Sequence, residues 1–307
     1  METVAIVSSI DLSGLVPHLQ ARLPQLKVAT WPHLDEASVT AAVCWHPPHG
    51  VLARFKSLRF IQSVGAGVDH IASDDVLPQV PLCRVVDDAQ SVGIGEYVHW
   101  AALYYQCAFD QAALQQSRQS WKQCQRVAAS AFTVGVLGLG EIGRVVASKL
   151  AVLGYAVRGW SRQCKTLEGV ACFAGGEQLH ECIGPCDLIV SLLPLTPHTS
   201  SLIDAAFLRR CKPGVAIVNC GRGRQLVLDD LRAALDDGSV RGAVLDVFDT
   251  EPLPLDHWAW RHPRVRVTPH MAGHASLHEI AVQVAANVAR SKAGEALRHV
   301  VDLRRGY

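Results

Sequence analysis

The stretch from Thr133 to Arg144 constrains the fold of this chain more than any other. It reads Thr-Val-Gly-Val-Leu-Gly-Leu-Gly-Glu-Ile-Gly-Arg, an apolar strand followed by a G-x-G-x-x-G turn and the start of an amphipathic helix. The first glycine permits a tight turn, the second lets the backbone approach a pyrophosphate, and the third lets the helix pack closely on the strand. The helix amides would then face the anion. We therefore predict a dinucleotide site, in preference to a purely structural turn, at Gly138, Leu139, Gly140, Glu141, Ile142 and Gly143.

Short β-like runs alternate with segments of helical spacing on both sides of this turn. Such alternation is typical of parallel sheets with helical crossovers, so we predict an α/β fold of two doubly wound parallel-sheet domains. The predicted strands are 4–7, 27–30, 42–45 and 60–63 in the first domain, and 133–137, 155–160, 188–193, 216–219, 242–246 and 265–268 in the second.

Two helical segments define the predicted domain organisation. The chain is irregular over 85–95, then apolar at helical spacing from 96 to 107, which indicates a crossing helix; 276–297 is a second long helix that returns to the first domain. The residues 115–126 are polar and are interpreted as a surface connection. We therefore expect a flavodoxin-like substrate domain of residues 1–98 plus 276–307, with a larger NADP-binding Rossmann domain, 99–275, inserted in it.

Composition narrows the possible partners. The chain has 307 residues, 49% of them hydrophobic, and a formal charge of +1 without a basic stripe, so neither nucleic acid nor a membrane surface is an expected partner. The N-terminus lacks a basic leader region, and the ten cysteines are dispersed without a C-x-x-C pair. We expect reduced thiols and a cytoplasmic location, in preference to structural disulfides or a metal cluster.

The end of the second Rossmann strand indicates which dinucleotide binds. NAD sites usually place an acidic residue there, whereas this chain has Trp160, Ser161 and Arg162, with Lys165 just beyond. A carboxylate would repel a 2′-phosphate, while a hydroxyl and a guanidinium would hold it. The pattern favours NADP, and the alternative is that the two cations belong to a solvated loop.

Three more segments follow predicted strands and bring Arg222, Glu251 and His270 to the same edge of the sheet. Reduction of a 2-oxo acid requires a hydride donor, a cation for the carboxylate and carbonyl oxygen, and an acid for the developing alkoxide. Arg222 can serve as the cation and His270 as the acid. Glu251 beside the imidazole would orient the ring and favour its protonated form.

At this point five motifs in order give the chain a recognisable likeness over nearly its whole length. Together they resemble the D-2-hydroxyacid dehydrogenase family: G-x-G-x-x-G, K-P-G at 212–214, N-x-x-R-G at 219–223, L-D-V-F-x-x-E-P-L at 245–253 and T-P-H-x-A-G at 268–273. A closer likeness is to the glyoxylate/hydroxypyruvate reductase A branch of that family. It rests on residues 44–48, 65–69, 160–162 and 251–254 and on the Arg-Gly-Tyr terminus at 305–307.

The resemblance assigns roles to residues around the sheet edge. It implies that Arg222, Glu251 and His270 are the catalytic Arg, Glu and His of the family, and that Asp246 holds the nicotinamide carboxamide. Cys220, two positions before the catalytic Arg, stands where other small residues are usual in the family, and it is expected to lie in the cofactor pocket. On the adenosine and phosphate side of the cofactor, the implied residues are Leu193, Pro194 and Thr199.

The resemblance also implies a substrate site in the first domain. The backbone amides of the turn formed by Gly65, Ala66 and Gly67 would bind the substrate carboxylate, which suits a glycine-flanked anion nest. Trp45 would limit the size of the pocket, and Arg222 would complete the substrate contacts. Members of the branch are homodimers, so a homodimer is implied here.

The sequence thus predicts an NADPH-dependent enzyme that reduces glyoxylate and hydroxypyruvate to glycolate and D-glycerate. Hydride comes from the nicotinamide and the proton from His270. Two alternatives stay open: a D-2-hydroxyacid dehydrogenase of another acid, and a non-catalytic, corepressor-like protein that senses the nicotinamide. His270, His274 and His278 are spaced like a metal-binding helix face, but Pro269 and Gly273 argue against a helix there, so no metal is expected.

Overall fold

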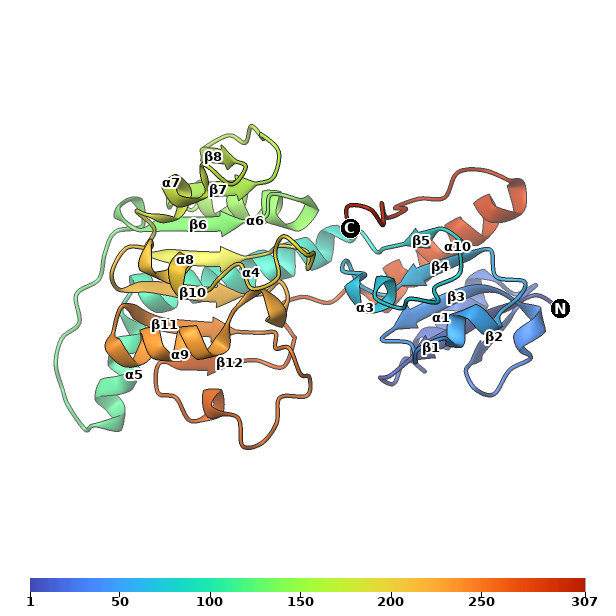
Figure 1. Cartoon of the computed structure of the whole chain (residues 1–307), viewed down its shortest axis with the longest axis horizontal. Coiled ribbons are helices and arrows are strands. Elements are labelled where there is room, and N and C mark those ends of the chain that lie inside the picture. The colour runs from blue at the N-terminus through green and yellow to red at the C-terminus, as the bar shows by residue number, and fades with distance from the viewer. Residues whose placement is uncertain (307) are drawn as a thin grey trace. The chain divides into compact units, whose positions relative to one another are not determined.

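The computed structural model describes residues 1–306, and Tyr307, the last residue of the predicted terminal motif, lies outside them. The chain forms two compact units, Met1–Ala89 with His274–Tyr307, and Gln90–Gly273 (Figure 1). The second unit is inserted in the first, as predicted from the sequence. The unit boundary at Ala89 comes earlier than the 98/99 boundary expected from the sequence, while Gly273 lies close to the expected end of the insertion.

The first unit is a five-stranded parallel sheet in the order β2-β1-β3-β4-β5. This is the flavodoxin-like order. Its strands are β1 Thr3–Ser8, β2 Lys27–Thr30, β3 Val39–Trp45, β4 Phe60–Ser63 and β5 Leu82–Cys83, and its helices are α1 Leu15–Arg22, α2 Val51–Arg54, α3 Asp69–Ala72 and α10 Leu277–Ala293, with a 3-10 turn at Glu36–Ser38.

Alternate residues of each central strand of this unit face opposite sides of the sheet. Val4 and Ile6 join the core beneath α1 and α10, whereas Ala5 and Val7 join the core beneath α2 and α3. Helix α10 begins at Leu277 because the Ser276 hydroxyl accepts a hydrogen bond from the Glu279 amide at 3.1 Å. The sheet is therefore covered on both faces, as a parallel sheet requires.

The second unit is a seven-stranded parallel sheet in the order β12-β11-β10-β9-β6-β7-β8. Its strands are β6 Thr133–Leu137, β7 Ala156–Ser161, β8 Val170–Ala174, β9 Leu188–Ser191, β10 Val215–Asn219, β11 Val240–Leu245 and β12 Val265–Val267. Its helices are α4 Asp88–Gln106, whose first two residues belong to the first unit, α5 Phe109–Ser117, α6 Glu141–Val152, α7 Leu179–Ile183, α8 Ala205–Arg209 and α9 Leu228–Asp237, with 3-10 turns at Ala129–Ala131, Gly223–Gln225 and Trp258–Trp260.

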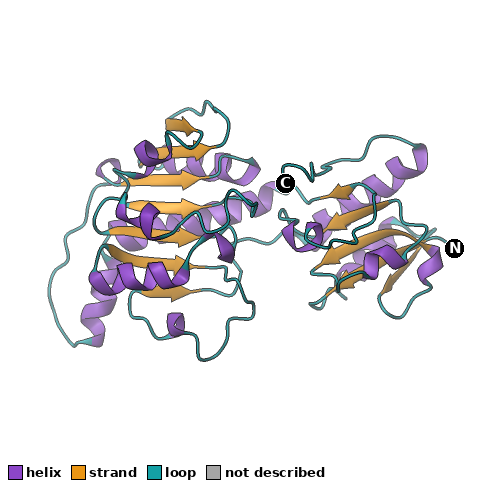
Figure 2. Cartoon of the chain, viewed as in Figure 1, coloured by secondary structure: helices purple, strands orange, loops and turns teal. Residues whose placement is uncertain are grey.

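Helices cover the two faces of this sheet (Figure 2), and a separate hydrophobic core lies on each face. Helices α4 and α6 contribute to one core through residues such as Val98 and Val146, and α7, α8 and α9 contribute to the other. Numbered from β6, the strand order is that of a Rossmann sheet with one additional strand, and it reverses between β6 and β9. The predicted fold of two doubly wound parallel-sheet domains is confirmed.

The elements that differ from the prediction have local causes. Strand β8 was not predicted because its residues are only half-buried, at the edge of the sheet. The segment 88–95, predicted irregular, is the start of α4; Gly93 and Gly95 weaken its helical signal, but the Asp87 carboxylate accepts a hydrogen bond from the Ala89 amide at the helix start. No helix within residues 1–306 has the length and hydropathy needed to span a bilayer.

Candidate active site

The glycine turn lies at the point where the strand order of the second unit reverses, between β6 and β9. Gly138 has φ +100°, and a Cβ there would lie 2.9 Å from the Leu192 carbonyl oxygen. A Cβ on Gly143 would run into the Gly138 carbonyl, whereas a Cβ on Gly140 would meet nothing within 4 Å. Two glycines are thus required by packing, and the third leaves open space in front of the turn.

That open space suits the pyrophosphate of a dinucleotide. Helix α6 begins after Gly140, which as a glycine has no side chain that could cap the first amides. Glu141 and Arg144 pair with each other at 2.7 Å on the surface of the first turn. The positive end of a helix dipole favours a bound anion, so the residues present fit the predicted cofactor.

The residues at the end of β7 and just after it divide into buried and exposed members. The Trp160 indole is buried in the core and donates to the Gly175 carbonyl at 2.7 Å, and the Ser161 hydroxyl donates to the Gln163 carbonyl at 2.6 Å. Arg162 and Lys165 are exposed, and no acidic residue stands between them in the sequence. The two cations are accessible to a phosphate, while Trp160 is held as part of the core.

The loop after β9 is held by a buried amide that sequence reasoning did not single out. Gln225 is fully buried; its Nε2 donates to the Leu193 carbonyl at 2.7 Å, and its Oε1 accepts from the Ser191 hydroxyl at 2.9 Å and from the Arg222 amide at 3.2 Å. A Cβ on Gly221 would collide with the Gln225 amide, which explains glycine at this position. Gln225 thereby fixes the β9 loop to the segment that carries Arg222.

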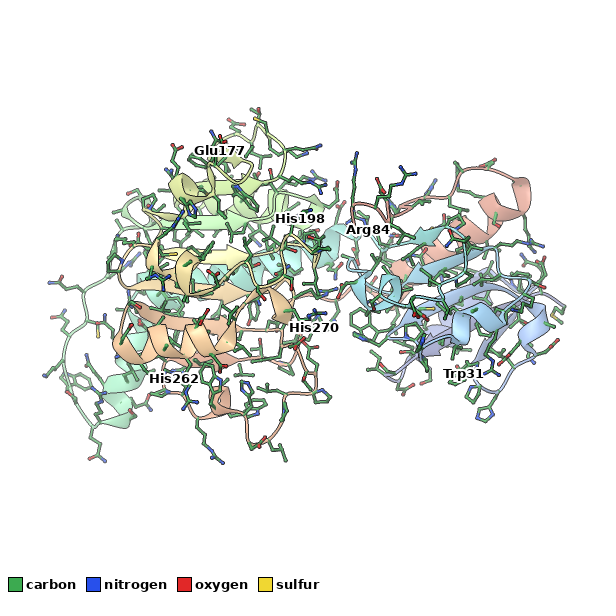
Figure 3. All side chains as sticks on the ribbon, in the orientation of Figure 1. Trp31, Arg84, Glu177, His198, His262 and His270 are labelled. Carbon is green, nitrogen blue, oxygen red and sulfur yellow. The ribbon has the colours of Figure 1, made fainter. Side chains whose placement is uncertain are left out.

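The other predicted cofactor residues of the β9 loop form a compact turn. The Thr199 hydroxyl donates to the Pro194 carbonyl at 2.6 Å and accepts from the Thr196 amide at 2.8 Å. His198 belongs to this turn, and Figure 3 shows it at the same edge of the sheet as His270. These contacts hold the turn beyond the carboxyl end of β9.

Arg222 follows β10 and begins a 3-10 turn. The Asn219 side chain holds this bend, since its Nδ2 donates to the Arg222 carbonyl at 3.0 Å and its Oδ1 accepts from the Gly221 amide at 3.1 Å. The guanidinium donates to the Gly221 carbonyl at 2.8 Å. Its positive charge is one of the causes that lower the pKa of Glu251, so Arg222 lies within electrostatic reach of that carboxylate.

Glu251 and His270 form a close pair. Glu251 Oε2 lies 2.8 Å from His270 Nδ1, and Oε1 accepts from the Phe248 amide at 2.9 Å. Burial raises the pKa of Glu251, but the hydrogen bonds from His270 and Phe248 and the charges of His270 and Arg222 outweigh it, so the pKa lies below its ordinary value. The carboxylate is therefore ionised near neutral pH and orients the imidazole.

Asp246 is the centre of the loop that carries His270. Its side chain is buried. Oδ1 accepts hydrogen bonds from the Thr268 hydroxyl at 2.6 Å and from the Met271 amide at 2.8 Å, and Oδ2 accepts one from the Ala272 amide at 2.9 Å. The role implied by the family resemblance was contact with the nicotinamide carboxamide. The structure shows a second role, in which Asp246 organises the loop from Thr268 to Ala272.

The Cys220 thiol lies close to this carboxylate. Burial, followed by the negative charge of Asp246, raises the pKa of Cys220 well above its ordinary value. The group is therefore a neutral thiol near neutral pH and does not provide a thiolate nucleophile. The contact of Cys220 with the cofactor remains a prediction.

The predicted substrate turn lies in the first unit, after β4. Among residues 1–306, the amides of Ala66 and Gly67 donate no hydrogen bond, which leaves them available for an anion. The Gly65 amide instead donates to the Ser63 hydroxyl at 3.2 Å. A Cβ on Gly65 would lie 2.9 Å from the Trp45 ring, so the indole forms one wall of this turn.

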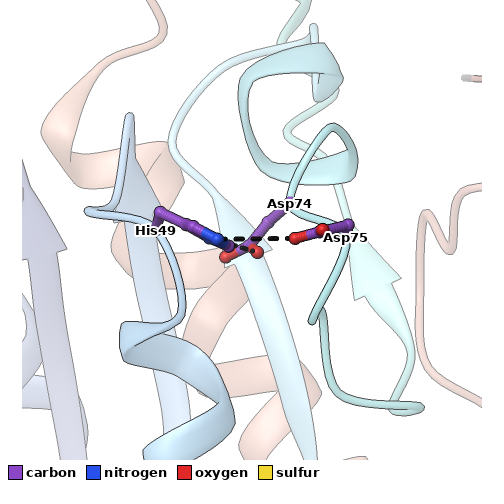
Figure 4. Close-up of side chains that lie close together, drawn as sticks. All are labelled: His49, Asp74 and Asp75. Atoms are coloured by element: carbon purple, nitrogen blue, oxygen red, sulfur yellow. Dashed lines mark hydrogen bonds and ion pairs between the residues drawn. The ribbon is translucent and has the colours of Figure 1, made fainter.

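The histidines considered as metal ligands do not group together. The segment 270–276 is not helical, and His278 contacts the Arg22 guanidinium at 3.1 Å. Within the described part of the chain, the side chains close enough to hold a metal ion are His49, Asp74 and Asp75 (Figure 4). His49 Nδ1 lies 3.0 Å from Asp74, and Nε2 lies 3.4 Å from Asp75. Contacts of one imidazole with two carboxylates account for this cluster.

Comparisons with known proteins identify relatives of this chain. The family model described as "D-isomer specific 2-hydroxyacid dehydrogenase, NAD binding domain" matches residues 101–272. A protein of Serratia proteamaculans named glyoxylate/hydroxypyruvate reductase A is 39% identical over 295 residues, which cover 94% of each chain. A Yersinia enterocolitica protein of the same name is 39% identical over 303 residues, covering 96% of this chain and 95% of that protein.

Solved structures show the same likeness. A D-isomer specific 2-hydroxyacid dehydrogenase from Xanthobacter autotrophicus, in complex with NADPH and MES, has a TM-score of 0.94 and 37% identity and covers 100% of this chain and 99% of that one. An NADPH-dependent glyoxylate/hydroxypyruvate reductase from Sinorhizobium meliloti, in complex with NADP and sulfate, has a TM-score of 0.94 and 32% identity over the full length of both chains.

Proposed function

Because the chain belongs to the D-isomer specific 2-hydroxyacid dehydrogenase family, we propose that it uses NADPH to reduce glyoxylate and hydroxypyruvate to glycolate and D-glycerate. The predicted resemblance to the glyoxylate/hydroxypyruvate reductase A branch is confirmed by relatives at 39% identity. Structural neighbours that hold NADPH or NADP support the choice of cofactor. The observation that carries the proposal is the Glu251–His270 pair, with Arg222 nearby, beyond the strands of a dinucleotide-binding sheet.

The proposed roles follow from the atoms that face each other. NADPH bound at the glycine turn supplies a hydride to the carbonyl carbon. His270 directs Nδ1 toward Glu251, so Nε2, on the opposite side of the ring, gives its proton to the carbonyl oxygen. Glu251 stabilises the imidazolium before transfer. The His270 side chain is 30% exposed, which allows a proton from solvent to restore the imidazolium after each turnover.

Binding of the substrate requires charge complementarity. The Arg222 guanidinium would attract the carboxylate and stabilise the negative charge that develops on the carbonyl oxygen. Within the first unit, the turn that carries the amides of Ala66 and Gly67 suits an anion. On the cofactor, Arg162 and Lys165 would bind the 2′-phosphate, and the amides of α6 would bind the pyrophosphate.

We also propose that the protein is a cytoplasmic homodimer. The described residues include all ten cysteines, each as a free thiol, and free thiols suit a reducing compartment. The homodimer rests on the resemblance to its branch. Light scattering coupled to size-exclusion chromatography tests it, and a monomeric mass at micromolar concentration would contradict it.

The function is tested by NADPH oxidation with a panel of 2-oxo acids that includes glyoxylate, hydroxypyruvate, pyruvate and phenylpyruvate. We expect the highest kcat/KM with the first two and lower values with NADH. His270→Ala and Arg222→Ala should lower kcat by orders of magnitude while NADPH binding is retained, and His180→Ala, an exposed histidine of the same unit, should be normal. Binding of NADPH without turnover of any acid would instead indicate a sensor.

A further inference from the structure

His270 lies in a strained segment of backbone. Its φ is +51°, in the left-handed region that residues with a Cβ rarely adopt. Its amide donates to the Asp246 carbonyl at 2.8 Å, and the two amides that follow it, those of Met271 and Ala272, donate to the Asp246 carboxylate. Such a conformation persists only when surrounding contacts hold it, so the position of the imidazole depends on the anchoring of this loop.

One face of helix α4 supports both ends of the loop. At the far end, Gln90 Nε2 donates to the Gly273 carbonyl at 3.2 Å, and a Cβ on Gly273 would lie 2.5 Å from the Ile94 side chain. At the near end, the Tyr97 hydroxyl lies 2.6 Å from the Thr268 hydroxyl. Residues 90, 94 and 97 share one helix face by their spacing, so a single rigid element brackets the loop.

The hydrogen bond between Tyr97 and Thr268 has a defined direction. The Thr268 hydroxyl has one proton, and it donates this proton to the Asp246 carboxylate, which can only accept when ionised. Thr268 therefore accepts from Tyr97. Burial is the main cause that raises the pKa of Tyr97, and the negative charge of Asp246 adds to it, so the phenol keeps the proton that this bond needs. The result is a chain from the Tyr97 O–H through the Thr268 O–H to the carboxylate.

We propose that Tyr97 is a positioning residue for the reaction, acting through Thr268 and Asp246 to hold His270 in its left-handed conformation beside Glu251. The phenol does not contact the imidazole in this scheme. Its hydroxyl fixes the rotamer of Thr268, which completes the set of donors around Asp246, and Asp246 in turn fixes the strained residue and the two amides that follow it. This proposal rests on the proposed function for its kinetic consequence.

The test removes single hydroxyl groups and measures turnover and loop mobility separately. Tyr97→Phe keeps the ring, and Thr268→Val keeps the shape of the side chain without its hydroxyl. For each we expect kcat with glyoxylate to fall about tenfold, the effect of one buried hydrogen bond, with KM and the Kd for NADPH within about twofold. Hydrogen exchange of the Met271 and Ala272 amides in the apoprotein, followed by mass spectrometry, should accelerate about tenfold.

Three further variants make the result specific. Tyr104→Phe is the matched control, because Tyr104 lies on the same helix and its buried hydroxyl has no hydrogen-bond partner among residues 1–306; kcat and exchange should be unchanged. Thr268→Ser retains the hydroxyl and should remain close to wild type. The double variant of Tyr97→Phe and Thr268→Val should lose no more activity than Thr268→Val alone, because both changes break one chain.

The proposal is overturned if Tyr97→Phe leaves either kcat or exchange at the wild-type value, if Tyr104→Phe reproduces the loss, or if the double variant shows the product of the two losses. If the wild-type protein turns over none of the 2-oxo acids, the proposed function is contradicted instead. In that case the exchange measurement still decides whether Tyr97 holds the loop.

Discussion

Replacement of Glu251 by glutamine tests how much the carboxylate contributes to catalysis. The oxygen of the new side chain could still accept from the Phe248 amide, but a neutral amide would replace the negative charge that lies 2.8 Å from His270. The fold should therefore be retained while the imidazolium loses its counter-ion. The expected effect is on kcat, because Glu251 is proposed to act on the proton donor and not on the cofactor.

The magnitude can be worked out from the exposure of the pair. Two unit charges about 4 Å apart attract each other by about 1 kcal/mol in water and about 4 kcal/mol at an effective dielectric constant of about 20. The side chains are 30% and 35% exposed, which places the pair between these limits. A charge-assisted hydrogen bond contributes about 2 kcal/mol. This corresponds to a loss of about thirtyfold in kcat, since about 1.4 kcal/mol is a factor of ten.

The pH profile gives a second, independent readout. The pKa of Glu251 is lowered in the folded protein, so the stabilisation from its carboxylate is complete above its ordinary value of 4.5 and is lost as the pH falls through the lowered value. Protonation of Glu251 should therefore lower the activity of the wild type only below about pH 4.5. Glutamine cannot be protonated in this range, so the variant should lack this acid limb.

The assay is steady-state NADPH oxidation with glyoxylate across pH, with NADPH affinity measured by fluorescence titration. Asp249→Asn is the matched control: Asp249 is an exposed carboxylate on the same loop, 3.8 Å from Arg224, and its loss should leave kcat within about twofold, as for an exposed ion pair. Wild-type kcat in Glu251→Gln, or an equal loss in Asp249→Asn, would refute the assigned role of Glu251.

Two further predictions concern the cofactor. Arg162→Ala should lower kcat/KM with NADPH about tenfold, through loss of a charge-assisted hydrogen bond to phosphate, without changing kcat/KM with NADH; an equal change with both cofactors would contradict this. Gly140→Ala should unfold in urea like the wild type, because its Cβ meets nothing within 4 Å, but it should bind NADPH more weakly. Gly143→Ala should instead lower the free energy of unfolding by about 2 kcal/mol. Unchanged NADPH affinity in Gly140→Ala would contradict the proposal that the pyrophosphate lies next to Gly140.

The fold could be predicted because its main signals are local. Alternation of strands and helices and the glycine turn are readable within about 30 residues, the length of one βαβ unit, and strands buried on both faces stand out as apolar runs. The elements that escaped prediction lack such a signal. Strand β8 is half-buried at an edge, β5 has only the residues Leu82 and Cys83, and the start of α4 contains two glycines.

The sequence allowed prediction of the candidate reactive groups of the site, but not of the residues that hold them in place. Arg222, Glu251 and His270 follow strands, so their convergence at one edge follows from the topology of a parallel sheet. Gln225 and Tyr97 gave no comparable signal, because each acquires its role through a tertiary contact. The Tyr97 and Thr268 hydroxyls that meet are 171 positions apart in the sequence. An isolated tyrosine on an apolar helix face is indistinguishable from a core residue until the fold is known.

Asp246 shows how the implied and the observed roles of one residue can coexist. An ionised carboxylate offers about four acceptor positions on its two oxygens. Thr268, Met271 and Ala272 occupy three of them, with two donors on Oδ1 and one on Oδ2. The remaining capacity lies on Oδ2 and suits a single donor, such as the amide of a nicotinamide carboxamide. Cofactor binding would then complete the same set of hydrogen bonds that holds the His270 loop, so that the proton donor is most firmly positioned when the hydride donor is bound.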